Sequence, residues 1–511
     1  MSLLQKILIV LIVANTNFLY SQDFSTSSIC KESNLKNFMG SDDDYLVFWD
    51  LFKYETVNRK TGEKVVTDVT TLYHGDMTGI IYDLEVRDGH IYEIARFVGK
   101  GRAITSCKVG FIKRNIETMK IVGDIEWVGD FSIWNYYDKP YYLDLHQYSG
   151  GFYLQSRKAP NGDQNSFLAQ YDEDLNMQWR TDLNYLAVNG VSYDELLFED
   201  NGNVLMKVEF KDVENAIKTR SGDVFPTGLS LFSFGADGDY IVITPELNET
   251  EVYNYNYFGF DEKSQELFGI FMISELDETG RKKVLRGQGY KYMRWDAEGN
   301  LLESSRKMFT YEDFWNEEAE EFMKVRGVER TTSNDDQFPR FGDVAFKVFV
   351  KENGNLIVTF GEIKSERLYR ETSELINSNL IFEIDTKGEF LWSRLIPKRR
   401  DGLYNDEIFI MAQDKLYIIN KEFSEFFTNG GYKMHHEGIR AGAENTCSAV
   451  IVLDTENGEI VERKTINEDM GEGFMYNGIL SRKYPDDYMY ETIMIHTRPR
   501  KNQVKYTRVT F

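Results

Sequence analysis

Three short segments carry side chains whose types and spacing could do chemistry. The first, "WNYYDKP", places three aromatic residues beside an acid: Trp134, Tyr136, Tyr137 and Asp138. Aromatic faces next to a carboxylate suit stacking on a sugar ring or capping of a peptide side chain. The alternative is a loop anchored by its own aromatic side chains.

The second segment, "PKRRDGLYND", is basic and supplies Arg399, Arg400 and Tyr404. Together with Arg340 in an earlier connection, these guanidinium groups could bind carboxylates or phosphates. A solvated run of charges would have the same composition, so this alternative stays open.

The third segment, "HHE", offers His435 and His436 as metal-capable groups. Adjacent residues on a loop seldom chelate one ion, and no third ligand is identifiable. We therefore expect no metal, and no cofactor. The sequence also contains no G-x-S-x-G, H-E-x-x-H, P-loop or G-x-G-x-x-G motif. Its 83 acidic residues make a chance pair of facing carboxylates certain, so a glycosidase pair needs coordinates.

The N-terminus and the charge bound the compartment. Residues 1–21 combine Lys6 with a short apolar stretch and end before polar chain, which predicts a cleaved signal peptide rather than a membrane anchor. We expect a secreted or periplasmic protein, free or associated with the cell surface, without a transmembrane segment after signal removal. A net charge of −24 argues against binding to nucleic acid.

Three cysteines, Cys30, Cys107 and Cys447, are too few for a disulfide framework. They allow one bridge and a spare thiol, or three reduced thiols.

An internal repeat predicts the fold. Seven hairpins of alternating strands recur at intervals near sixty residues, with one interval near ninety. They span residues 80–97, 141–156, 193–210, 255–272, 344–360, 407–420 and 477–495. A second hairpin follows most of them, at 167–183, 231–247, 292–309, 380–396 and 449–466, with a degenerate version at 107–128.

Two hairpins per period give four antiparallel strands per unit, which is typical of propeller blades. We expect residues 22–511 to form one all-β propeller of about seven four-stranded blades, with six or eight as alternatives. The last unit lacks a fourth strand, so we expect a strand from Asp44–Val57 or Glu63–Tyr73 to complete it and close the ring.

The long interval contains one acidic amphipathic segment, Thr310–Gly327, within an insertion of about 310–340. Thr310 and Asp313 have capping-box spacing, which predicts a helix between blades. It would serve as a lid on the rim or as a docking helix for a partner.

The hairpins "DTKGEFLW" (385–392) and "DEDLNMQW" (172–179) are similar to the D-x-x-G-x-x-x-W turn of quinoprotein-like propeller repeats. That resemblance implies that the Trp packs between neighbouring blades, and it does not extend to the cofactor. More broadly, the chain resembles uncharacterised secreted propeller-like proteins of Bacteroidota, a resemblance that implies no known activity.

The two faces of such a ring differ in their loops. Turns between first and second and between third and fourth strands are short, whereas connections on the other face are long and varied. The long ones include 210–228, 274–289, 363–379 and 420–446, with 128–140 and 397–406 between blades. Because long loops tend to be functional, we expect this face to bind a protein or glycan of the cell envelope without catalysis. The alternative is a carbohydrate hydrolase or lyase with carboxylates at the mouth of the central channel.

Overall fold

The computed structural model describes most of the chain from Asp23 to Thr510. The longer segments that it does not describe are 1–22, 32–37, 100–105, 133–142, 157–166, 184–190, 199–203, 211–227, 315–339, 403–407, 424–445, 466–473 and 497–502. The remaining breaks are one to four residues long.

The described residues form eight antiparallel sheets that follow one another along the chain. The first comprises β3 (Phe38–Ser41), β4 (Tyr45–Asp50), β5 (Lys53–Asn58) and β6 (Lys64–Thr67). The second comprises β7 (Thr71–His74), β8 (Met77–Arg87), β9 (His90–Gly99), β10 (Ser106–Asn115) and β11 (Ile121–Ser132). The third comprises β12 (Leu143–Tyr148), β13 (Gly151–Ser156), β14 (Phe167–Tyr171) and β15 (Met177–Asp182). The fourth comprises β16 (Val191–Phe198), β17 (Val204–Phe210), β18 (Gly228–Phe234) and β19 (Tyr240–Ile243).

The fifth comprises β20 (Glu251–Asp261), β21 (Glu266–Thr279), β22 (Lys282–Trp295) and β23 (Leu301–Met308). The sixth comprises β24 (Arg340–Val350), β25 (Leu356–Leu368), β26 (Glu371–Ile384) and β27 (Phe390–Gly402). The seventh comprises β28 (Ile408–Ala412), β29 (Lys415–Phe423), β30 (Thr446–Asp454) and β31 (Ile460–Thr465). The eighth joins β32 (Phe474–Tyr484), β33 (Met489–His496) and β34 (Gln503–Thr510) to β1 (Asp23–Thr26) and β2 (Cys30–Lys31).

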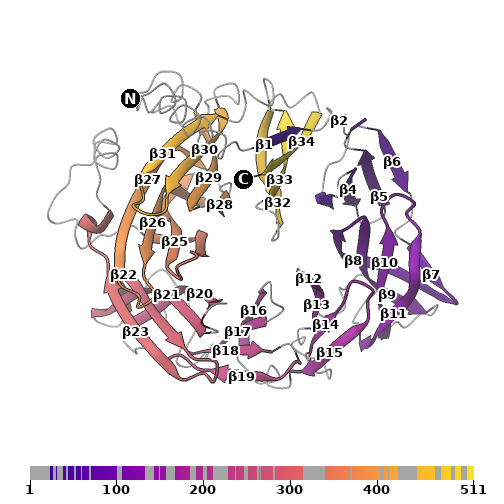
Figure 1. The fold of residues 1–511 in the computed structure, drawn as a ribbon, viewed down its shortest axis with the longest axis horizontal. Coiled ribbons are helices and arrows are strands. Elements are labelled where there is room, and N and C mark those ends of the chain that lie inside the picture. Colours follow the sequence, from indigo (N-terminus) through magenta and orange to yellow (C-terminus); the bar gives the residue numbers. More distant parts are fainter. Residues whose placement is uncertain are drawn as a thin grey trace, which may run out of the picture.

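The sheets stand in a ring around a common centre, with the first strand of several sheets innermost (Figure 1). Burial follows from this arrangement. The middle strands β13 and β14 are buried on both faces, because neighbouring sheets cover both, whereas the outer strand β15 is mostly exposed. The fold is therefore all-β and propeller-like, as the sequence predicts.

The N-terminal region differs from the expectation. Asp44–Val57 does not complete the last sheet, because it forms β4 and most of β5 of a sheet of its own, and Glu63–Tyr73 supplies β6 and most of β7. This extra sheet raises the number from the expected seven to eight. The strand that pairs with the C-terminal β34 is β1, in the register Asp23↔Thr510 to Thr26↔Thr507. Four residues are too few to show an alternating pattern, so this strand leaves no visible sign in the sequence.

Two of the predicted long loops are strands instead. Residues 274–289 and 363–379 extend the hairpins β21–β22 and β25–β26, in which Thr279 pairs with Lys282 and Leu368 with Glu371. These segments carry mixed charges instead of alternating apolar residues. A prediction based on apolar alternation therefore does not identify them as strands.

Of the predicted helix, the described residues hold one 3-10 turn, Tyr311–Phe314. The capping box is present, since the Thr310 N–H donates to Asp313 Oδ2 at 2.6 Å. Phe314 is buried against Phe309 and Phe360. The rest of the predicted helix, 315–339, lies outside the described residues. No helix among the described residues has the length and apolar character needed to cross a bilayer.

Tryptophan–glycine contacts join neighbouring sheets at equivalent places. Trp179 on β15 packs on Gly238 in the β18–β19 turn, and Trp392 on β27 packs on Gly458 in the β30–β31 turn. Both glycines have positive φ, at 84° and 70°. These are the tryptophans of the two hairpins 172–179 and 385–392, and each contacts the next sheet.

We expect Gly458→Ala to destabilise the fold by about 2–4 kcal/mol, because a Cβ there would lie 2.5 Å from the Trp392 ring and would add overpacking to the cost of positive φ. Gly123→Ala is the matched control, since Gly123 has φ 75° but no atom within 4 Å of the place that a Cβ would take, and we expect a loss of about 1 kcal/mol. Denaturant unfolding of the two variants measures the difference. Equal losses of stability in the two variants would show that Gly458 and Trp392 are not tightly packed.

A buried ion pair lies between the β3–β6 and β7–β11 sheets. Arg114 donates to both oxygens of Glu93, at 2.6 and 3.0 Å, and to the Met119 carbonyl at 2.8 Å. The Arg114 guanidinium also lies 5.7 Å from the centre of the Tyr54 ring on β5. Glu93 is fully buried and Arg114 is 6 % exposed, so this pair joins two sheets away from water.

Candidate functional site

The structure separates the basic residues that the sequence grouped together. Arg340 begins β24, whereas Arg399 and Arg400 lie within β27, not in a loop. Strands β25 and β26 stand between them, so three strand spacings, about 14 Å of backbone, separate the two groups. The backbone of Arg340 and that of Arg399 and Arg400 thus lie at opposite edges of one sheet, and a joint guanidinium site stays a prediction.

The other predicted site residues lie outside the described residues: Trp134, Tyr136, Tyr137, Asp138, Tyr404, His435 and His436. Segment 133–142, which holds the aromatic cluster, connects β11 to β12. Its two ends, Ser132 and Leu143, border a group of polar residues that the sequence analysis did not single out.

That group centres on Asp83, in the strand β8. A bulge between Ile81 and Asp83 inserts Tyr82 as an extra residue and re-aims the side chains that follow it. Asp83 Oδ1 accepts the Leu84 N–H at 3.0 Å, and Oδ2 accepts the Leu145 N–H of β12 at 3.1 Å. The carboxyl therefore bridges two neighbouring sheets.

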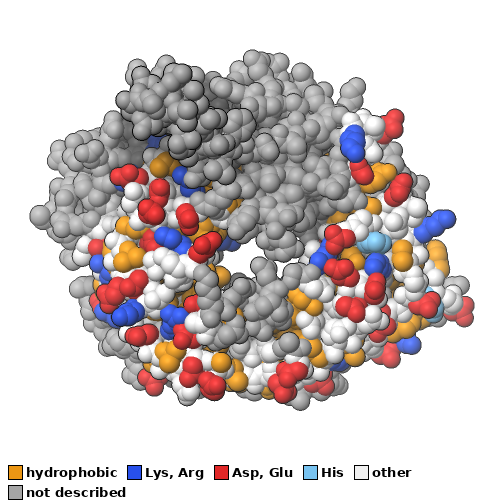
Figure 2. Space-filling model, viewed as in Figure 1, with side chains coloured by type: hydrophobic (Ala, Val, Ile, Leu, Met, Phe, Trp, Pro, Cys, Tyr) orange, Lys and Arg blue, Asp and Glu red, His pale blue; other side chains and the backbone are white. Residues whose placement is uncertain are grey.

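The strands that Asp83 joins lie toward the centre of the ring (Figure 1). β12 is an edge strand that pairs with β13 on one side only, so the Leu145 N–H given to Asp83 is on its unpaired inner edge. β8 and β12 are among the strands nearest the centre (Figure 1), and the space-filling view shows an opening there (Figure 2).

The environment of Asp83 changes its acidity. The pKa of Asp83 is raised from 3.8 to about 6, mainly because the carboxyl is buried; nearby Glu85 and Asp144 contribute to the rise, and the two N–H donors oppose it. The carboxyl is therefore partly protonated near neutral pH, with two more acidic side chains within electrostatic reach.

Behind Asp83, between the same two sheets, lie Tyr82, Arg96 and Cys107. Burial raises the pKa of Tyr82 far above its usual range and that of Cys107 to about 11, with Arg96 opposing both shifts. Arg96 is 4 % exposed, and the Tyr82 hydroxyl has no hydrogen-bond partner among the described residues. Cys107 is a free thiol, and its high pKa argues against a nucleophilic role.

Within the described part of the chain, no three His, Cys, Asp or Glu side chains are grouped so that they could hold a metal ion.

One sequence signal could have found this site. Counting back from the short turn, Asp83-Leu84 in "YDLEV" and Asp144-Leu145 in "LDLHQ" occupy the same repeat position. An acidic residue at the same position of the innermost strand in two adjacent repeats is unusual, because acidic side chains are rarely buried.

No protein-family model matches the chain, and no curated protein matches it. Solved structures that resemble it include the polysaccharide lyase Uly1, at 10 % identity over 88 % of this chain and 93 % of that one, with a TM-score of 0.38. A lignostilbene dioxygenase of Pseudomonas brassicacearum shares 10 % identity over 96 % and 93 %, with a TM-score of 0.35. The GH93 α-L-arabinofuranosidase of Fusarium graminearum, solved with arabinobiose, shares 9 % over 76 % and 92 %, with a TM-score of 0.28. Because these TM-scores are below 0.5, the fold assignment rests on the sheet topology of the chain itself.

Proposed function

We propose that this chain is an exported carbohydrate-active enzyme, a hydrolase or lyase, that acts at the centre of the ring. The observation that carries the proposal is Asp83, a carboxyl of pKa about 6 that connects β8 to β12 of the next sheet, with Glu85 and Asp144 nearby. Cleavage of a glycosidic bond by a hydrolase needs one protonated carboxyl as acid and a second carboxylate as base or nucleophile.

In this proposal Asp83 protonates the glycosidic oxygen as the sugar leaves. The N–H donors of Leu84 and Leu145 hold the carboxyl in place, and each of its oxygens keeps a lone pair that can carry the proton. Glu85 or Asp144 supplies the second carboxylate. The aromatic cluster at 134–138, which follows β11 in the chain, is our candidate for stacking on the sugar.

The experiment is a turnover screen of the purified chain against neutral and uronate polysaccharides. Release of reducing ends indicates hydrolysis, and ultraviolet absorbance of an unsaturated uronate indicates lyase action. We expect turnover of at least one substrate. A chain that binds polysaccharides but cleaves none of them would overturn the proposal.

One observation favours a second candidate, a non-catalytic binder of a protein or glycan of the cell envelope. Both Asp83 oxygens accept backbone N–H groups, so the same carboxyl also holds β8 and β12 together. A binder would use the predicted long-loop face, and pull-down of one partner by an inactive chain would support it.

We further propose that the eight sheets are blades of one closed propeller, in which β1 and β2 on β34 join both ends of the chain. The pairing of Asp23–Thr26 with Thr507–Thr510 supports closure, because it covers the edge of the last sheet. Export through the signal at 1–21 to the periplasm or beyond is part of this proposal. N-terminal sequencing of the protein recovered from the envelope tests it, and a chain that still begins at Met1 in the cytoplasm would contradict it.

A further inference from the structure

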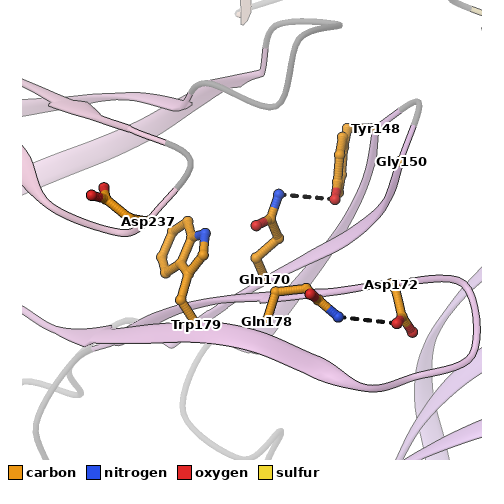
Figure 3. A pocket seen from close by; sticks show the side chains of 7 residues that line it. All are labelled: Tyr148, Gly150, Gln170, Asp172, Gln178, Trp179 and Asp237. Atoms are coloured by element: carbon orange, nitrogen blue, oxygen red, sulfur yellow. Dashed lines mark hydrogen bonds between the residues drawn. The ribbon is translucent and has the colours of Figure 1, made fainter.

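A cavity of about 540 Å³ lies between the β12–β15 and β16–β19 sheets, on the short-turn face. Its wall includes Tyr148 and Trp179, the amides of Gln170 and Gln178, and the carboxylates of Asp172 and Asp237 (Figure 3). Asp172 and Asp237 belong to the β14–β15 and β18–β19 turns. The cavity is therefore on the face opposite to the predicted long loops.

The Trp179 indole in this wall is fixed in place. Its ring stacks on Phe234 with an interplanar angle of 8°, packs on Gly238, and is 9 % exposed. Its Nε1–H has no acceptor among the described residues. The indole nitrogen is turned toward Gln170 and Tyr148 (Figure 3). A buried N–H group without an acceptor lowers the stability of the fold by about 1–3 kcal/mol. Its presence at Trp179 therefore needs an explanation.

At the equivalent position of the β24–β27 sheet, the tryptophan has a hydrogen-bond acceptor within the protein. Trp392 pairs with Glu383 across β26–β27 as Trp179 pairs with Gln170 across β14–β15. There the Trp392 indole N–H donates to Glu383, which also accepts from Lys351 at 3.0 Å and from Asn355 at 2.7 Å. That indole is satisfied by the protein itself.

In the β12–β15 sheet, other residues occupy the positions of the side chains that hydrogen-bond to Glu383. Counted along the first strand of each sheet in the registers that the pairings give, the place of Lys351 is taken by Tyr148. The amide of Gln170 donates to the hydroxyls of Tyr148 and Tyr153, at 2.8 and 2.9 Å, instead of accepting from the indole. The space that a lysine and an asparagine close in one repeat is left as a cavity in the other.

The hydrogen-bond donors and acceptors in the cavity wall restrict the kind of ligand that can bind. Asp172 and Asp237 can only accept hydrogen bonds when ionised, whereas the indole can only donate. A sugar hydroxyl does both, and it can also hydrogen-bond to the Tyr148 hydroxyl. An ammonium group could pair with the carboxylates, but it has no lone pair for the indole or the amide.

We propose that this cavity is a binding site for a neutral saccharide, separate from the Asp83 group. The proposal does not depend on turnover at the centre of the ring. The carboxylates at its mouth disfavour uronates, so the site discriminates by charge.

The test uses protein labelled with nitrogen-15 at tryptophan and follows the indole N–H signals by NMR during titration with D-glucose, D-galactose, L-arabinose, N-acetylglucosamine and D-glucuronate. We expect at least one neutral sugar to shift the Trp179 signal, which is assigned by its absence in Trp179→Phe, and glucuronate to shift it less. We expect Trp179→Phe and Asp237→Asn to weaken binding of that sugar about 5- to 20-fold by calorimetry.

Trp392→Phe is the matched control, because it removes an indole N–H at the closed position, and it should leave sugar affinity unchanged. Asp83→Asn should also leave it unchanged, which separates this site from the proposed catalytic one. Asp237 is exposed on a turn, so its variant keeps the test valid if Trp179→Phe is unstable. The proposal is overturned if no sugar shifts the Trp179 signal, if L-lysine alone shifts it, or if both site variants bind the sugar as tightly as the unaltered chain.

Discussion

Asp83→Asn should lower kcat/KM on the cleaved polysaccharide by about 100-fold or more. General acid catalysis contributes about 10²- to 10⁴-fold, and asparagine keeps the size of the side chain but has no proton to give. In the unaltered chain, kcat/KM should fall as pH rises through about 6, because burial raises the pKa of Asp83 to that value and the protonated form is the acid. The variant should lack this limb of the pH profile.

The controls for this variant are Asp144→Asn and Glu85→Gln, of which at least one should also lower turnover, and Asp124→Asn. Asp124 is exposed on β11, so its replacement by asparagine should leave kcat/KM unchanged. An Asp83→Asn chain that keeps full turnover, or that keeps the fall above pH 6, would remove Asp83 from the mechanism.

The same pKa shift has a consequence for stability. Because the pKa of Asp83 is raised from 3.8 to about 6 in the folded chain, the folded state binds the proton more tightly than the unfolded state. Its stabilising contribution is present below about pH 4 and is lost as pH rises through 6, at a cost of up to about 3 kcal/mol. Asp83→Asn should therefore lose stability relative to the unaltered chain at pH 4.5 but less, or none, at pH 7.5. Urea unfolding at the two pH values measures this, and a pH-independent difference would contradict the raised pKa.

Arg114→Ala should destabilise the fold by about 3–5 kcal/mol. The substitution leaves the Glu93 carboxylate fully buried without the two hydrogen bonds of 2.6 and 3.0 Å, and an unpaired buried charge is far more costly than the pair is favourable. The Met119 carbonyl loses a donor as well. Denaturant or thermal unfolding measures the loss.

Two controls isolate the cause. Glu93→Leu combined with Arg114→Met removes both charges at similar volume and should cost much less than Arg114→Ala alone. Lys60→Met breaks an ion pair with Asp44 whose side chains are 77 % and 53 % exposed, and it should change stability by less than about 1 kcal/mol. If the double replacement were as damaging as the single one, lost packing rather than the unpaired charge would be responsible.

Most of the strand order could be read from the sequence because apolar alternation and short Gly-containing turns are local. All seven first hairpins are present, from β8–β9 to β32–β33. The segments 44–57 and 63–73 hold β4, β6 and most of β5 of the extra sheet, and their strand character is visible in the sequence. The sequence does not show that they form a sheet of their own, because sheet partners depend on the tertiary structure and β3 is only four residues long. The charged extensions of β21–β22 and β25–β26 were mistaken for loops for another reason: strands beyond the packed core need no apolar alternation.

The sites were harder to predict than the fold. Segments rich in aromatic, basic or histidine residues were visible in the sequence, yet the groups that the structure brings together are single residues in ordinary strands. Asp83 meets Leu145 across 62 positions, and Trp179 meets Gly238 across 59, because each contact joins one sheet to the next. A contact between sheets has no local pattern.

By itself, the sequence determined the all-β class, the four-stranded repeat and the short turns within the hairpins. These features depend on side-chain periodicity and on glycine conformations, which neighbouring residues settle. The tertiary structure alone decided how many sheets the described chain forms, which N-terminal strands pair with β34, and which carboxyl connects β8 to β12. It also decided that Trp392 is satisfied while Trp179 has no acceptor among the described residues, because burial and hydrogen-bond partners depend on the sheet that packs alongside.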